Sequence, residues 1–214
     1  MRLVLPRLYV ILDAALLTIP ETECARQLVD AGVRLLQYRN KTASARDLLE
    51  SSRRLSAELM LRGVTLIVND RADIAALAHA SGVHVGQNDL DVEQARTIVG
   101  GGKLVGISTH NRAQFEQAAA TSADYIAVGP IFSTSTKSNP DPIVGTEFIR
   151  QMRPLTDKPI VAIGGITLER AVEVVRAGAD SAAVISDILH ASDPGARARQ
   201  FIEKLEAANH AASV

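Results

Sequence analysis

The chain has 214 residues, of which 47% are hydrophobic and 22% charged, with a formal net charge of −1. This balance offers no basic field to attract nucleic acid or an anionic membrane, and 3% aromatic content without tryptophan argues against base-stacking surfaces. Cys24 is the single cysteine, so no internal disulfide can form, which is typical of the reducing cytoplasm. No apolar run approaches the roughly 20 residues of a membrane span, and the N-terminus lacks a signal-peptide pattern.

Short apolar runs of strand length alternate along the chain with stretches of helical spacing. We expect strands over residues 8–12, 35–38, 65–68, 82–85, 104–107, 125–128, 159–163 and 181–185. We expect helices over residues 21–31, 44–62, 91–99, 112–121, 147–152, 168–177 and 194–208, with another ending at Ala78. The strands are continuously apolar, as parallel strands covered on both faces are.

These units number about eight and are roughly 25 residues long, which predicts an α/β fold of the (β/α)₈ TIM-barrel type. We expect a single catalytic domain over residues 1–208 and a frayed, disordered tail over residues 209–214. An open doubly wound sheet is the main alternative. It usually has fewer strands and a glycine-rich loop after the first one, and no such loop follows Leu12.

In a barrel the carboxyl ends of the strands converge on one mouth, where active sites are built. Polar residues, glycines and one isoleucine follow most of the predicted strands at that end. In chain order these residues are Gln37, Arg39, Lys41, Asn69, Asp70, Gln87, Asp89, Ser108, His110, Thr134, Thr136, Lys137, Gly164, Gly165, Ile185 and Ser186. The pattern predicts that polar groups gather at one rim of an otherwise apolar barrel.

Two kinds of ligand are indicated by this rim. The groups that can hold more anionic oxygens than one monophosphate offers are Arg39, Lys41, Asn69 and Lys137. Asp70 and Asp89 beside these cations suggest Mg²⁺ bridging the protein and a diphosphate. The hydroxyl-rich loop of residues 133–136 and the loops at Gly164-Gly165 and Ile185-Ser186 resemble a phosphate-ester site.

Each feature also has a purely structural interpretation. Asp70 and Asp89 could be turn or helix-capping residues, and Gly164-Gly165 a tight turn between strand and helix. His84 lies within a strand run and is better explained as a core residue, whereas His110 is balanced between site and surface. The coincidence of all these groups at the same strand ends favours a site.

The residues also resemble a known family, thiamine phosphate synthase, over most of the chain from Leu8 to about Phe201. The segments that carry the resemblance are Gln37-Tyr38-Arg39-Asn40-Lys41, Asn69-Asp70-Arg71, His84-Val85-Gly86-Gln87-Asn88-Asp89-Leu90, Gly106-Ile107-Ser108, Gly129-Pro130-Ile131-Phe132, Thr134-Ser135-Thr136-Lys137, Ala162-Ile163-Gly164-Gly165-Ile166 and Ile185-Ser186. The resemblance implies a barrel enzyme that joins a hydroxymethylpyrimidine diphosphate to a thiazole phosphate and releases diphosphate.

The resemblance also implies a role for each matching residue. Those on the pyrimidine diphosphate would be Gln37, Arg39, Lys41, Asn69, Ser108 and Lys137, with Arg39, Lys41, Ser108 and Lys137 also catalytic. Those on the thiazole phosphate would be Thr134, Ser135, Thr136, Gly165, Ile185 and Ser186. Asp70 and Asp89 would hold Mg²⁺. The implied mechanism is dissociative: diphosphate leaves first, and the thiazole nitrogen then attacks the pyrimidine methylene cation.

Three further expectations remain open at this point. An isomerase of the same fold, a thiazole tautomerase, would need no diphosphate site and would use a histidine such as His110, and a sensor of thiamine phosphates would bind without turnover. Residues 138–145 are expected to form a mobile lid. The sequence leaves both a monomer and a homo-oligomer open.

Overall fold

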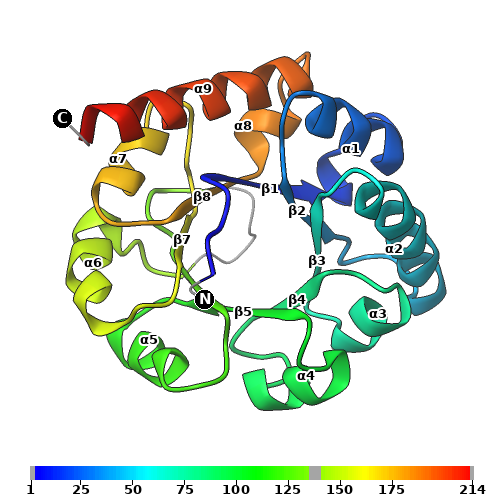
Figure 1. The fold of residues 1–214 in the computed structure, drawn as a ribbon, viewed down its shortest axis with the longest axis horizontal. Helices are drawn as coiled ribbons and strands as arrows, with labels where there is room; N and C mark the ends of the chain where they lie inside the picture. The colour runs from blue at the N-terminus through cyan, green and yellow to red at the C-terminus, as the bar shows by residue number, and fades with distance from the viewer. Residues whose placement is uncertain (1–2, 135–140, 213–214) are drawn as a thin grey trace.

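The computed structural model describes residues 3–134 and 141–212 and forms a closed barrel of parallel strands in chain order (Figure 1). The strands are β1 (Leu8–Asp13), β2 (Leu35–Arg39), β3 (Thr65–Asn69), β4 (Gly82–Val85), β5 (Leu104–Thr109), β6 (Tyr125–Val128), β7 (Ile160–Ile163) and β8 (Ser181–Val184). The helices are α1 (Glu21–Asp30), α2 (Ala45–Met60), α3 (Ala72–Leu77), α4 (Val92–Val99), α5 (Arg112–Ala119), α6 (Gly145–Met152), α7 (Ala171–Arg176), α8 (Ser186–Leu189) and α9 (Pro194–Ala212), with 3₁₀ turns η1 (Ala14–Leu16) and η2 (Arg153–Leu155). The predicted (β/α)₈ barrel is confirmed.

Local chemistry explains most element boundaries. Ser44 and Asp91 cap α2 and α4 by accepting hydrogen bonds from backbone amides of the first turn. Strand β7 begins one residue later than expected, because Pro159 has no amide proton for a ladder hydrogen bond. Helix α9 continues to Ala212, beyond the end expected at residue 208, since its alanine-rich end favours helix. Residues 213 and 214 of the expected tail lie outside the described part.

Apolar side chains form two layers, one inside the barrel and one between the barrel and its helices. Alternate residues of each strand point inward, so Tyr9, Ile11, Leu35, Ile67 and Tyr125 fill the interior. The outer layer contains Cys24, which is 1% exposed, as expected of a small core residue. No helix in the described ranges is long and apolar enough to cross a membrane.

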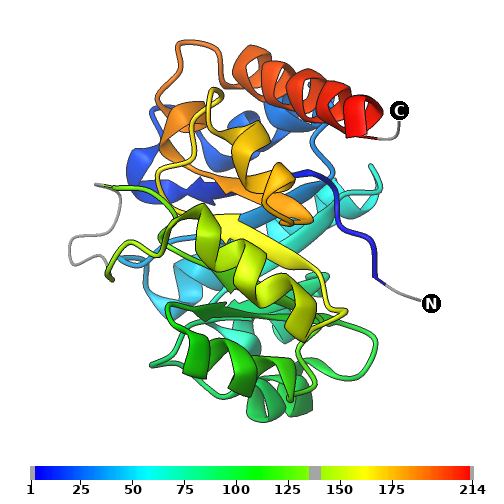
Figure 2. The same cartoon turned by 90° about the vertical axis from the view of Figure 1, so that its left-hand side faces the viewer.

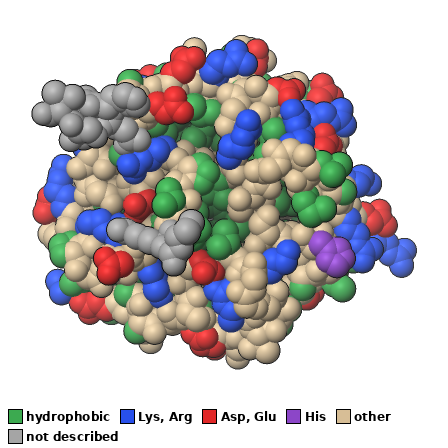
Figure 3. Space-filling model, in the orientation of Figure 1, with side chains coloured by type: hydrophobic (Ala, Val, Ile, Leu, Met, Phe, Trp, Pro, Cys, Tyr) green, Lys and Arg blue, Asp and Glu red, His purple; other side chains and the backbone are tan. Residues whose placement is uncertain are grey.

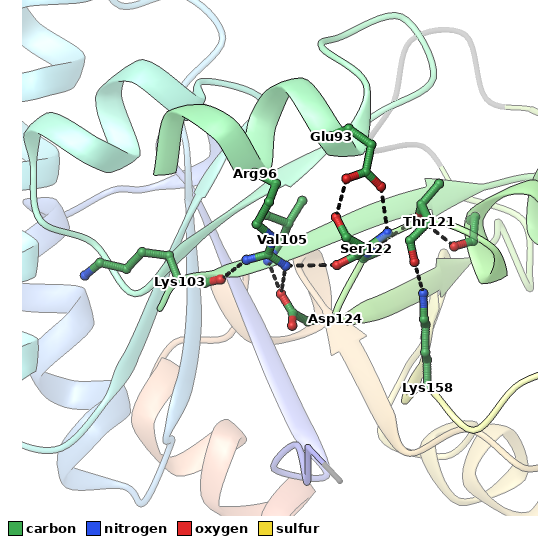
Figure 4. A network of polar contacts seen from close by, with 10 residues as sticks. Glu93, Arg96, Lys103, Val105, Thr121, Ser122, Asp124 and Lys158 are labelled. Atoms are coloured by element: carbon green, nitrogen blue, oxygen red, sulfur yellow. Dashed lines mark hydrogen bonds and ion pairs between the residues drawn. The ribbon is translucent and has the colours of Figure 1, made fainter. Parts of the chain in front are cut away.

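Two ion pairs of the same design tie loops together near the amino ends of the strands, and we name them the Arg–Asp clamps. In the first, Arg96 on α4 pairs with Asp124, whose Oδ2 also accepts the backbone amide of Val105 at 2.7 Å (Figure 4). In the second, Arg153 Nη1 lies 2.6 Å from Asp180 Oδ2, which accepts the amide that opens β7 at 2.8 Å. The partners are 28 and 27 positions apart in sequence, so the device recurs with nearly the same spacing.

The ends of the described chain lie on the face that carries the amino ends of the strands. Figure 2 shows the segment that leads into β1 and the end of α9 on one side of the barrel. The loop that follows β6 lies on the opposite side. In Figure 3 the face nearer the termini carries Lys and Arg interspersed with Asp and Glu around its rim, with hydrophobic side chains toward the centre. The carboxyl ends of the strands, where a site was predicted, therefore lie on the face away from both termini.

Candidate active site

A cavity of about 510 Å³ opens at the carboxyl ends of the strands. The predicted site residues that line it are Gln37, Arg39, Lys41, Asn69, Asp70, Asp89, Ser108, Thr134, Gly165, Ile185 and Ser186. Ser135, Thr136 and Lys137 lie outside the described residues, as does part of the expected lid over residues 138–145. The cavity thus brings together residues from seven predicted strand ends.

Arg39 is anchored by a carboxylate that was not predicted from sequence. Its guanidinium forms an ion pair with Asp13, which closes β1 and whose side chain is only 3% exposed. Asp13 Oδ1 also accepts a hydrogen bond from the amide of Ala15 at 3.2 Å. The signal for this residue in the sequence is its position, because Asp13 directly follows the first apolar run, as the other rim residues follow theirs.

The two predicted metal ligands face each other across neighbouring loops. Asp70 has a left-handed backbone with φ of 61°, and its amide donates to the carbonyl of His84 at 2.7 Å. Burial raises the pKa of the Asp70 carboxyl and Asp89 raises it further, while the ion pair with Lys41 acts in the opposite direction. Asp89 also accepts the amide of Gly86 at 2.7 Å, so the turn interpretation holds for this residue beside any role in binding.

The opposite wall of the cavity is formed by the loops after β6, β7 and β8. Gly164 and Gly165 have φ of 100° and 62°, and a Cβ at Gly165 would lie 2.3 Å from the carbonyl oxygen of Ser133. The glycine pair therefore lets the β6 loop approach closely, and the amide of Phe132 donates to the carbonyl of Gly164 at 3.0 Å. Thr134 and Ser186 lie at this wall.

Both histidines near the rim contribute to the cavity. His84 is 8% exposed and was expected to be a core residue, yet its ring lies at the cavity floor with Nε2 2.8 Å from Ser108 Oγ. Burial lowers the pKa of His84 to about 4, so its ring is neutral near pH 7. His110 Nδ1 lies 2.6 Å from the carbonyl oxygen of Gly129, and its Nε2 lies 3.5 Å from Asp141 Oδ2.

A wider, shallower hollow of about 580 Å³ adjoins the cavity at Thr134, Gly165 and Ser186. Arg170, which was not predicted as a site residue, lies here over the ring of Phe132 and donates to the carbonyl of Gly165 at 3.0 Å. Together with the main cavity, this arrangement has Arg39, Lys41 and two carboxylates on one side, and glycine loops, hydroxyls and Arg170 on the other. The fold and the site define a (β/α)₈-barrel protein with a polar cavity at the carboxyl ends of its strands.

Comparison with known proteins narrows this class. Residues 8–188 match the profile of a family described as thiamine monophosphate synthase. Thiamine-phosphate synthase of Koribacter versatilis is 51% identical over 94% of this chain and 96% of the relative, and that of Chloroflexus aurantiacus is 44% identical over 91% and 90%. A solved thiamine phosphate pyrophosphorylase from Pyrococcus furiosus superposes with a TM-score of 0.86 at 30% identity, over 94% of this chain and 96% of that one. The chain belongs to the thiamine monophosphate synthase family, as its motifs predicted.

Proposed function

We propose that this chain is a transferase that condenses 4-amino-5-hydroxymethyl-2-methylpyrimidine diphosphate with 4-methyl-5-(2-phosphoethyl)thiazole, giving thiamine monophosphate and diphosphate. The observation that carries the proposal is one cavity with two unlike walls. A wall of cations, an amide and carboxylates suits a diphosphate and its metal, and a wall of glycine loops and hydroxyls suits a phosphate ester. An enzyme that handles one monophosphate has no use for the first wall.

The donor set of Asp70 and Asp89 fits Mg²⁺, which prefers hard oxygen ligands and usually takes one or two carboxylates plus phosphate oxygens. Burial, and to a smaller extent the neighbouring Asp89, raise the pKa of the Asp70 carboxyl, and a divalent cation would stabilise its ionised form. When bound, Mg²⁺ supplies positive charge to the diphosphate oxygens. Within the described residues no group of three or more His, Cys, Asp or Glu could form an all-protein metal cage, in keeping with a site completed by substrate.

The chain's own residues would act by holding the leaving group. Arg39, fixed by Asp13, and Lys41 would bind diphosphate oxygens together with Asn69 and Lys137, which stabilises the charge that develops as diphosphate departs. Gln37 and Ser108 would orient the pyrimidine ring, whose amino group donates electrons to the methylene cation.

The second substrate would bind the opposite wall. Its phosphate would lie on residues of the last three strand ends, namely Thr134, Ser135, Thr136, Gly165, Ile185 and Ser186. Because the attacking thiazole nitrogen carries no proton, the site needs no general base for this step, and positioning supplies much of the remaining catalysis.

The test is diphosphate release with both substrates and Mg²⁺, measured for the wild type and for Asp70→Asn. Asparagine is preferred to alanine because it tolerates the left-handed backbone at this position. We expect turnover to fall by about a hundredfold or more, the scale seen when one charge-stabilising group is removed. The matched control is Asp73→Asn, which removes an exposed carboxylate that pairs with Arg71 and does not line the cavity.

Undiminished release by Asp70→Asn would contradict the assigned role of Asp70. Isomerisation of the thiazole phosphate without diphosphate release by the wild type would instead favour the tautomerase, which the comparisons do not support. Placement in the cytoplasm is part of the proposal and is supported by Cys24, a buried free thiol.

A further inference from the structure

A continuous chain of hydrogen bonds crosses the barrel interior below the cavity, and we name it the interior hydrogen-bond chain. Gln37 Nε2 donates to the Tyr9 hydroxyl at 2.9 Å, and the Tyr9 and Tyr125 hydroxyls lie 3.1 Å apart. The Tyr125 hydroxyl lies 3.1 Å from His84 Nδ1, and His84 Nε2 lies 2.8 Å from Ser108 Oγ. The two ends of the interior hydrogen-bond chain are therefore Gln37 and Ser108, the residues assigned above to the pyrimidine ring.

Proton counting gives this chain a direction. Tyr9 accepts from Gln37, and either hydroxyl can be the donor between Tyr9 and Tyr125; the Tyr9 proton has an acceptor in the described part of the chain only in the arrangement in which Tyr9 donates to Tyr125. In this arrangement Tyr125 donates to Nδ1 of His84, and a neutral imidazole that accepts at Nδ1 carries its proton on Nε2. His84 then donates to Ser108. Solvent has little access to these hydrogen bonds, because both tyrosines are at most 1% exposed and His84 is 8% exposed.

The direction decides what each end offers to a ligand. Ser108 already accepts a hydrogen bond from His84, so its own proton is available to the cavity. Gln37 uses one of its two amide N–H groups toward Tyr9, and its carbonyl oxygen receives no hydrogen bond from the described part of the chain. The cavity thus presents one donor at Ser108 and one acceptor at Gln37.

We propose that the interior hydrogen-bond chain is a positioning device that fixes the Ser108 hydroxyl as a donor and the Gln37 carbonyl as an acceptor toward an aminopyrimidine ring. The identity of the ring rests on the proposed function, whereas the direction of the chain is a property of the free protein. An aminopyrimidine matches this pair, because its ring nitrogens accept hydrogen bonds and its amino group donates them. An oxopyrimidine would place its carbonyl oxygen against the carbonyl of Gln37 and is selected against.

The same acceptor serves the reaction. As diphosphate leaves, the amino group gives electron density to the ring and its N–H bonds become more polar. A carbonyl oxygen already held in place by Tyr9 stabilises that change without reorganising. Tyr9, Tyr125 and His84 touch no reacting atom in this scheme and act only through Gln37 and Ser108.

The first experiment reads the direction of the chain directly. Long-range proton–nitrogen NMR correlation on the full-length protein, labelled with ¹⁵N-histidine at neutral pH, shows which ring nitrogen carries the proton. The His84 signals among the five histidines are assigned by their loss in His84→Gln. We expect the proton on Nε2 and a bare Nδ1. A proton on Nδ1 would overturn the proposal, and neither result depends on the activity of the enzyme.

The second experiment tests the action at a distance by calorimetry with the pyrimidine diphosphate alone and the thiazole phosphate alone. Tyr125→Phe should weaken the pyrimidine diphosphate by about tenfold, the scale of one hydrogen bond, and leave the thiazole phosphate unchanged. In the background of Ser108→Ala the same substitution should have little further effect, because its influence passes through Ser108. In Tyr125→Phe, the affinity for the aminopyrimidine relative to the corresponding oxopyrimidine should also decrease.

The matched control is Tyr38→Phe, which removes another buried tyrosine hydroxyl that bonds to Glu21 outside the barrel interior. This variant should bind both ligands as the wild type does. Full additivity of Tyr125→Phe with Ser108→Ala, or equal weakening of both ligands, would show a general structural role and overturn the proposal. Failure of the wild type to release diphosphate would refute the proposed function while leaving the NMR result valid.

Discussion

At the scale of single residues, Asp70 is a position where folding and binding have opposite requirements. Its carboxylate is partly buried beside Asp89, and its pKa is therefore raised above the ordinary value of 3.8 despite the ion pair with Lys41. A raised pKa means that the folded state holds the proton more tightly than the unfolded chain does. Ionised Asp70 consequently destabilises the free protein at neutral pH, and the same charge is what a metal would bind.

Asp70→Asn is therefore expected to raise the free energy of unfolding at neutral pH. The sign follows from linkage between proton binding and folding. The free energy of unfolding falls as the pH rises from 3.8 through the raised pKa of Asp70, because the folded protein binds this proton more tightly than the unfolded chain. Replacing the carboxylate with an amide removes this pH-dependent loss of stability. The gain should shrink as the pH is lowered toward 4. Urea unfolding at several pH values, with a chelator present, measures the effect.

Asp73→Asn supplies a control of opposite sign for this experiment. The pair with Arg71 lowers the pKa of the Asp73 carboxyl, so that group adds stability at neutral pH that is lost as pH falls. Because the pair is exposed, the loss should be under about 1 kcal/mol. A decrease in stability for Asp70→Asn as well would contradict the assigned direction of the Asp70 pKa.

At the scale of elements, the packing of Tyr125 from β6 against β5 depends on a single glycine, Gly106. A Cβ at Gly106 would lie 2.1 Å from the Cζ atom of Tyr125, so only glycine lets the tyrosine ring lie across β5 and reach His84. The two rings stack with centroids 5.5 Å apart. The interior hydrogen-bond chain is thus built into the pairing of two neighbouring strands.

Gly106→Ala should displace Tyr125 and lower the free energy of unfolding by about 1–3 kcal/mol, the usual effect of overpacking a core. It should also weaken binding of the pyrimidine diphosphate, because Ser108 loses its fixed orientation. Gly102→Ala is the control, since a Cβ there meets nothing within 4 Å. Urea unfolding and calorimetry compare the two variants, and equal stability of both would contradict the packing argument.

The element scale also shows what could be predicted from sequence. Continuous apolar runs followed at once by polar residues placed the strand ends, and hence the rim residues such as Gln37 and Asp89, correctly at the cavity. His84 was interpreted as a core residue because it lies inside a run, and it is buried as expected; because the uppermost inward positions of a barrel form the cavity floor, it also lines the cavity. Which inward residue occupies that layer depends on how neighbouring strands are shifted along one another. Asn69, the last residue of β3, pairs with His84, which lies one residue before the end of β4, and this shift cannot be recognised from the sequence of either strand alone.

At the scale of the whole molecule, the two ends of the barrel have different tasks. The cavity lies at the carboxyl ends of the strands, and the Arg–Asp clamps lie at the amino ends. In barrels of this type the first face carries the chemistry and the second contributes stability. Changes at the clamps should therefore alter folding without altering catalysis.

We expect Asp124→Asn and Asp180→Asn each to lower the free energy of unfolding by about 1–2 kcal/mol, because each carboxylate accepts both a guanidinium and a backbone amide. The double variant should show close to the sum, since the two carboxylates bind different arginines and different backbone amides. Urea unfolding measures stability, and diphosphate release measures kcat/KM, which should match the wild type. A loss of kcat/KM at unchanged stability would contradict the division between the two faces.

The position of the chain ends has a consequence for protein engineering. Both ends of the described chain lie on the face that carries the amino ends of the strands and the Arg–Asp clamps, away from the cavity (Figure 2). A second enzyme tethered at either end would be attached behind the barrel, so the tether would not cross the path of the substrates. The two tethered active sites would open to solvent independently, and an intermediate would pass between them by diffusion rather than through a shared channel.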